Sequence, residues 1–199
     1  NGSVSEITLI EKAKEMGFYT ITTGNNPSLP GHAYADEYIP ADYSDMKTVL
    51  DIVVKHNISR IVSCANDFGV ITASYVAEQL NLPGHDTYKN AVTIHHKDRF
   101  KELTKRLGIP SPLSHYFDSY DSAYQYALSA EYPLIIKSVD LTGGKGVERA
   151  NNITEACKAI KRSIESSRMG RIVIEPYIVG TQQSIDTFVI NGKVVASVS

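Results

Sequence analysis

The spacing of apolar residues predicts alternating helices and strands in the first part of the chain. A first helix is expected to begin in the capping box Ser3-Val4-Ser5-Glu6 and to end at Gly17. Further helices are predicted at 45–56 and at 68–80, the latter capped by Asn66 or Asp67. The predicted strands are 18–23, 35–39 and 60–64. Repeated strand and helix units with short connections predict an α/β fold with a doubly wound parallel sheet. Because the first predicted element is a helix, we expect a further strand of this sheet before Asn1.

A different pattern begins at Thr87 and predicts a second, α+β unit. An amphipathic helix over 98–107 is expected to turn Phe100, Leu103 and Leu107 inward, and Gly108-Ile109-Pro110-Ser111-Pro112 then forms a hinge. The predicted strands are 115–117, 134–137, 147–150, 171–175, 184–190 and 193–198, and the predicted helices are 122–130 and 154–167. Asn191-Gly192 is a strong signal for a two-residue hairpin. The second unit is therefore expected to be mostly antiparallel.

Composition narrows the possible function classes. The 199 residues are 42% hydrophobic and 21% charged, with a formal net charge of -2, which is typical of an ordinary globular protein. This balance offers no electrostatic case for binding nucleic acid or an anionic membrane. Cys64 and Cys157 are far apart among apolar neighbours, which favours small core residues in a reducing compartment, the cytoplasm.

The segment from Pro133 to Arg149 carries the strongest chemical signal. A buried strand ends at Lys137, and the loop Thr142-Gly143-Gly144-Lys145-Gly146 follows before Val147. Glycines let main-chain N–H groups approach an anion without obstruction, and two lysines add positive charge, so the pattern predicts a phosphate-binding loop, exposed and mobile when empty. It matches neither the P-loop nor the dinucleotide fingerprint. A glycine-rich hairpin whose lysines serve solubility is the alternative.

Five ordered motifs resemble the ATP-grasp superfamily, which includes biotin carboxylase, carbamoyl phosphate synthase and the purine-biosynthetic ligases. The motifs are His96-Lys97-Asp98-Arg99-Phe100, Gly108-Ile109-Pro110-Ser111-Pro112, Tyr132-Pro133-Leu134-Ile135-Ile136-Lys137, Gly143-Gly144-Lys145-Gly146-Val147 and Ile174-Glu175-Pro176-Tyr177-Ile178-Val179-Gly180. The first unit resembles the domain that precedes ATP-grasp in these enzymes. The resemblance implies a pre-ATP-grasp domain at 1–90 and an incomplete ATP-grasp domain at 91–199, with its small lobe at about 112–175.

The resemblance also implies a role for each matching residue. Lys97 and Lys137 would hold the α and β phosphates of ATP, although a solvated helix lysine is the alternative for Lys97. The expected loop residues over the β and γ phosphates are Thr142, Gly143, Gly144, Lys145, Gly146 and Val147. The expected adenine hinge is Glu175, Pro176, Tyr177 and Ile178. Plain core packing is the alternative for Tyr177 and Ile178, and it is compatible with the adenine role because adenine needs an apolar slot. Gln182 stands where the family usually has a glutamate for the ribose hydroxyls.

No catalytic residue and no metal ligand is assigned within these residues. Family members bind Mg²⁺ through two acidic residues and an asparagine, which would lie beyond a point equivalent to Ser199. Adjacent His95 and His96 point about 100° apart on a helix and do not suggest a shared metal. ATP and Mg²⁺ are therefore the expected cofactors, with the Mg²⁺ ligands downstream.

The resemblance implies an ATP-dependent ligase of the carboxylate-amine or carboxylate-thiol type that works through an acyl phosphate. Its partners would be a small-molecule carboxylate and an amine, with no nucleic acid or membrane. The alternatives are a carboxylase-type enzyme that uses bicarbonate and a nucleotide-binding domain without catalysis. The 199 residues alone are expected to be inactive, and an open sheet edge would favour association of copies, which makes a homodimer a candidate assembly.

Overall fold

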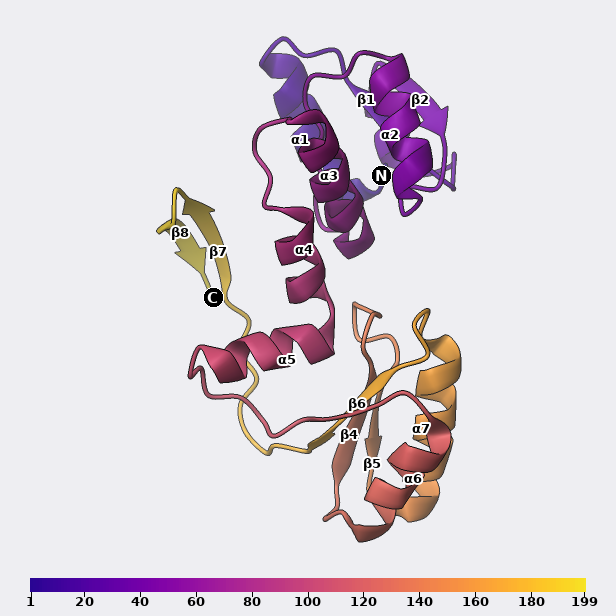
Figure 1. The fold of residues 1–199 in the computed structure, drawn as a ribbon. Coiled ribbons are helices and arrows are strands. Elements are labelled where there is room, and N and C mark those ends of the chain that lie inside the picture. Colours follow the sequence, from indigo (N-terminus) through magenta and orange to yellow (C-terminus); the bar gives the residue numbers. More distant parts are fainter.

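A computed structural model describes residues 1–199, and Figure 1 shows two bodies joined by a pair of helices. The elements of the first body are α1 (Val4–Glu15), β1 (Ile21–Gly24), the 3₁₀ helix η1 (Pro30–Tyr34), β2 (Glu37–Pro40), α2 (Met46–Lys55) and α3 (Asp67–Leu80). Strands β1 and β2 are parallel, with Ile21 beside Glu37 and Gly24 beside Pro40. The predicted α/β class is confirmed, and the parallel sheet contains two strands within this chain.

One of the two helix caps predicted in the first body is confirmed. The Asn66 side chain accepts a hydrogen bond from the Gly69 N–H at 2.9 Å and so begins α3. At α1 the expected capping box is not made in its usual form, because the Ser3 hydroxyl donates to the Glu6 carboxylate and caps no backbone N–H. Apolar residues of α2 and α3 meet in a small core of Val49, Val53 and Val76.

The prediction of a strand at 60–64 is wrong. This segment has no regular structure, and Val62 is exposed. A strand exists only through hydrogen bonds to a neighbouring strand, and β1 and β2 pair with each other alone. The apolar run therefore has no ladder to join.

Two helices, α4 (Tyr88–His95) and α5 (Lys97–Arg106), lie between the bodies (Figure 1). The sequence did not predict α4, which is short and has only a weak apolar face. The orientation predicted for α5 is wrong for Phe100 and Leu107, which are exposed, whereas Leu103 is half-buried and Thr104 is buried. The inward face is formed by Lys97, Lys101 and Thr104. Their spacing is helical, but because they are polar, a search for periodic apolar residues does not find this face.

The second body is a four-stranded sheet in the order β3-β6-β4-β5. All of its strand pairs are antiparallel, in agreement with the mostly antiparallel unit that the sequence predicts. Its strands are β3 (His115–Phe117), β4 (Leu134–Ser138), β5 (Val147–Ala150) and β6 (Ile172–Pro176), and its helices are α6 (Tyr120–Ser129) and α7 (Ile153–Ser166). Both helices cover one face of the sheet (Figure 1), where alternate residues such as Ile136 and Ile174 form the main core. Alternation therefore turns Lys137 and Glu175 to the opposite face.

The chain ends in a separate hairpin of β7 (Asp186–Ile190) and β8 (Lys193–Val198). The expected two-residue turn is confirmed, since Asn191 and Gly192 have φ values of 49° and 73° and so adopt the left-handed conformation of a type I′ turn. Every residue of the two strands is exposed, and Figure 1 shows the hairpin away from the four-stranded sheet. None of the helices is both long and apolar enough to cross a membrane.

Candidate functional site

A buried glutamate with three hydrogen-bonding partners lies on the face of the four-stranded sheet opposite α6 and α7. Glu175 is 3% exposed, and its Oε2 accepts a hydrogen bond from Lys137 on the neighbouring strand. Its other oxygen, Oε1, lies 3.0 Å from Nζ of Lys101 on α5 and accepts a hydrogen bond from the Ser114 hydroxyl at 2.7 Å. A strand lysine and a helix lysine therefore share one carboxylate.

The carboxylate of Glu175 is held in its charged form. Burial alone raises its pKa, but the hydrogen bond from Lys137, the hydrogen bond from Ser114 and the two lysine charges outweigh burial, so the pKa lies below its ordinary value of 4.5. A carboxylate this deeply buried stays ionised only while a cation and hydrogen-bond donors remain beside it.

The contribution of Glu175 to the free energy of unfolding should decrease on acidification. Because its pKa is lower in the folded state, Glu175 contributes stability above about pH 4.5 and loses that contribution as the pH falls through the folded-state pKa. We expect Glu175→Gln to be less stable than the wild type at pH 7, with the difference shrinking on acidification. Urea unfolding from pH 7 to pH 3 measures this, and a difference that is constant with pH would contradict it.

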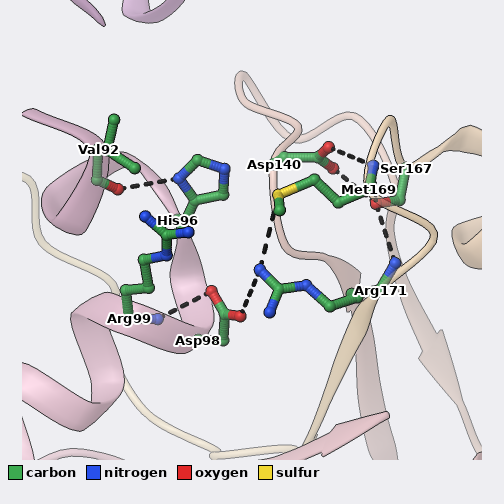
Figure 2. Close-up of polar contacts among 8 residues, drawn as sticks. All are labelled: Val92, His96, Asp98, Arg99, Asp140, Ser167, Met169 and Arg171. Carbon is green, nitrogen blue, oxygen red and sulfur yellow. Dashed lines mark hydrogen bonds and ion pairs between the residues drawn. The ribbon is translucent and has the colours of Figure 1, made fainter. Parts of the chain in front are cut away.

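Helix α5 is fixed against the sheet at its first turn. Asp98 forms an ion pair at 2.9 Å with Arg171, which directly precedes β6, and Figure 2 shows the two side chains pointing toward one another. The loop that carries Arg171 is itself tied down, because the buried Asp140 carboxylate accepts from the Ser167 hydroxyl at 2.8 Å and from the Met169 N–H at 3.0 Å (Figure 2). The lysines of α5 are thus presented to the sheet by an anchored helix.

Lys97 lies where α5 meets the segment after β4. Its backbone N–H donates to the carbonyl of Val139 at 3.0 Å, and its ammonium group donates to the carbonyl of Leu141. Burial lowers the pKa of Lys97, and the positive charge of Lys137 lowers it further. The structure therefore brings together two predicted phosphate-binding lysines that are distant in sequence.

The glycine loop follows directly and has unused donors. Gly143, Gly144 and Gly146 have φ values of 63°, 75° and 64°, a region that favours glycine. Their backbone N–H groups donate no hydrogen bond within the chain. The loop is exposed from Gly143 to Lys145, as predicted, but Gly146 is half-buried, because it packs against Ser138 and Leu141.

A cleft of about 480 Å³ separates this loop from α3, α4 and the segment between them. Lys97, Thr142, Gly143, Gly144 and Val147 line it. The facing wall includes Asp67 and His85, which the sequence does not indicate as site residues. It also includes His95, for which the sequence favours a solvent-facing or phosphate-adjacent position over a metal site. The cleft is therefore bounded by both units of the chain.

None of the residues predicted to contact adenine and ribose lines the cleft. Pro176 ends β6, and Tyr177, Ile178 and Gln182 follow it in an exposed segment. Tyr177 donates its N–H to the carbonyl of Pro133 at 2.9 Å, and the Arg149 guanidinium lies 4.1 Å from the centre of its ring. Ile178 is 62% exposed and its N–H makes no hydrogen bond. The alternative of plain core packing is thus wrong for Tyr177 and Ile178. Pro176 and Gln182 are exposed as well.

Sequence reasoning missed Lys101 and Ser114, the two further partners of Glu175. A signal for Lys101 was available, since it follows Lys97 by four residues and so lies on the same face of a helix. No group of three or more His, Cys, Asp or Glu side chains in residues 1–199 is arranged to hold a metal ion. The donors present here do not make a site for Mg²⁺.

The sequence of this chain is similar to sequences of known proteins. Residues 95–199 match the family model described as phosphoribosylglycinamide synthetase, ATP-grasp (A) domain. Phosphoribosylamine–glycine ligase of Lactococcus lactis is 35% identical over 127 residues, which cover 63% of this chain and 30% of that protein. The large chain of carbamoyl phosphate synthase from Clostridium acetobutylicum is 27% identical over 188 residues, which cover 87% of this chain and 16% of that protein.

A solved structure shares the fold. The biotin carboxylase domain of 2-oxoglutarate carboxylase from Hydrogenobacter thermophilus, a dimer in complex with MgADP, ADP and bicarbonate, superposes with a TM-score of 0.71 at 20% identity. The match covers 89% of this chain and 43% of that one. The chain thus spans less than half the length of each of these three relatives.

Proposed function

Since the chain belongs to the ATP-grasp family of phosphoribosylglycinamide synthetase, we propose that it binds ATP through the lysines and the glycine loop of its second unit. The complete gene product would be an ATP-dependent ligase that joins a carboxylate to an amine or thiol through an acyl phosphate. Residues 1–90 would be the pre-ATP-grasp domain and 91–199 the first part of the ATP-grasp domain, with its small lobe at about 112–175.

One observation carries the proposal: three lysines gather beside unpaired backbone donors. Lys101 and Lys137 share the carboxylate of Glu175, and Lys97 is near enough to Lys137 for that charge to lower the pKa of Lys97. Within the same region, three glycine N–H groups of the loop have no partner in the chain. A polyanion with many acceptor oxygens, such as a triphosphate, satisfies both the charges and the donors.

The proposal gives each of these groups a task. Lys97 and Lys137 would bind phosphate oxygens, and the loop amides would donate to oxygens on the side of the cleft. The free N–H of Ile178 would donate to the adenine edge, and the Gln182 amide oxygen would accept from a ribose hydroxyl. When bound, ATP supplies the phosphoryl group that activates the carboxylate.

A second candidate is a carboxylase-type reaction with bicarbonate as the carboxylate. The match to carbamoyl phosphate synthase favours it, since it covers 87% of this chain.

A homodimer and a cytoplasmic location belong to the same proposal. The dimer reported for the biotin carboxylase domain supports the former, and two free, half-buried thiols, Cys64 and Cys157, support the latter.

The test is ADP release by the complete gene product over a panel of carboxylates with and without amines. Ligase chemistry predicts ADP release that depends on an organic carboxylate, and hydroxylamine should then trap the acyl phosphate as a hydroxamate. Release that depends on bicarbonate alone would favour the carboxylase. Tight ADP binding without any turnover would contradict both enzymatic proposals and would favour a nucleotide-binding domain without catalysis.

A further inference from the structure

We infer that Lys101 is a positioning residue that decides whether Lys137 is free to bind a nucleotide phosphate. This inference rests on the proposed function. When Lys137 turns to the phosphate, Lys101 keeps the Glu175 carboxylate neutralised. Without Lys101, Glu175 retains Lys137 for itself.

The two oxygens of Glu175 divide the partners between them. Oε2 is bonded to Lys137, whereas Oε1 is held by both Lys101 and Ser114. If Lys137 leaves, Oε1 therefore keeps a cation at 3.0 Å and a hydroxyl donor at 2.7 Å. A carboxylate this deeply buried could not lose its only cation without a large penalty, so the second cation makes the exchange possible.

Lys137 is the partner that is placed to move. Its side chain is 24% exposed and that of Lys101 is 15% exposed, while Glu175 is nearly fully covered. Lys137 lies opposite Val173 on one side and opposite Val147 on the other, and Val147 directly follows the glycine loop. Lys137 is thus the one of the pair next to the proposed phosphate site.

Lys101, by contrast, is held in place by its helix. The Asp98–Arg171 ion pair and the hydrogen bond from the Lys97 N–H to Val139 fix the first turn of α5 against the sheet. Lys101 lies one turn further along this anchored helix. Its ammonium group therefore stays at Glu175 while the Lys137 side chain changes partner.

The argument predicts a specific non-additivity in ADP affinity. Lys101→Met should weaken ADP binding by about tenfold, because a charge-assisted contact from Lys137 to phosphate is then lost to Glu175. Glu175→Gln should tighten it, since the competing carboxylate is gone. The double variant should bind like Glu175→Gln alone, because Lys101 has nothing left to neutralise. Lys101→Arg should bind like the wild type.

Calorimetric titration with ADP and with adenosine tests this in the complete gene product. Adenosine carries no phosphate, so its affinity should be the same in all four variants and the wild type. A merely structural role for Lys101 would weaken adenosine and ADP alike, and the double variant would then be at least as weak as Lys101→Met. Either result would overturn the inference. Thermal unfolding of each variant checks that the variant is folded. If Lys101→Met does not fold, Lys101→Arg can still be titrated.

The same experiment separates this inference from the proposed function. If the wild type does not bind ADP, the proposed function fails. If the wild type binds ADP and Lys101→Met binds it equally well, only the role of Lys101 fails.

Discussion

Replacement of Lys137 by methionine is expected to weaken ADP binding by roughly tenfold to more than a hundredfold, since a hydrogen bond between charged groups is worth about 1.5 to 3 kcal/mol or more. The fold should survive, because Lys137 projects from the face of the sheet opposite the main core. Glu175 would still be held by Lys101 and Ser114. Methionine also preserves most of the apolar part of the side chain.

Lys161→Met provides the matched control. Lys161 is exposed on α7, the helix that covers the other face of the same sheet. Calorimetric titration of both variants with ADP decides the matter. Equal affinity of Lys137→Met and Lys161→Met would remove Lys137 from the phosphate site.

Replacement of Gly146 by alanine is expected to destabilise the protein by about 2 to 4 kcal/mol, through left-handed strain and overpacking together. A Cβ at this position would lie 2.6 Å from the Ser138 hydroxyl and 2.9 Å from Leu141. Ser138 cannot give way easily, because it is fully buried and its hydroxyl donates to the carbonyl of Ser163 at 2.8 Å. The φ of 64° adds its own cost.

Gly144→Ala separates strain from crowding. Gly144 has a similar φ of 75°, but a Cβ there would have nothing within 4 Å. We expect it to cost only the conformational term of about 1 to 2 kcal/mol. Urea unfolding of both variants measures the difference, and equal losses would show that Ser138 does not constrain the loop. If the whole loop were exposed, a substitution at either glycine would cost little stability. Gly146 departs from this expectation because a Cβ there would be crowded by Ser138 and Leu141.

The part of the fold that the sequence predicts well is the part with local signals. Alternating apolar residues, the glycine loop and Asn191-Gly192 each act over a few residues, and the strands and hairpin appear where these signals place them. The strand predicted at 60–64 depends instead on a neighbour in space. No local pattern reports whether that neighbour is present.

The site shows the same division. The spacing of motifs indicates Lys97, Lys137 and the loop, and the structure places Lys97 and the loop at one cleft. Apolar spacing could not predict the inward face of α5, because that face is polar: Lys101 forms an ion pair with the buried carboxylate of Glu175, and the buried residue is Thr104. Glu175 likewise combines two roles that sequence does not separate: its backbone leads into the proposed adenine hinge, and its side chain holds two lysines.

The most direct measurement of the central claim is an amide NMR titration of the ¹⁵N-labelled protein with ADP and, separately, with adenosine. The unpaired N–H groups of Gly143, Gly144 and Gly146 should shift with ADP and stay unchanged with adenosine, because only ADP brings phosphate oxygens to them. The N–H of Ile178 should shift with both ligands. Loop signals that ignore ADP, or that respond equally to adenosine, would contradict the assignment of the glycine loop and its lysines to nucleotide phosphates.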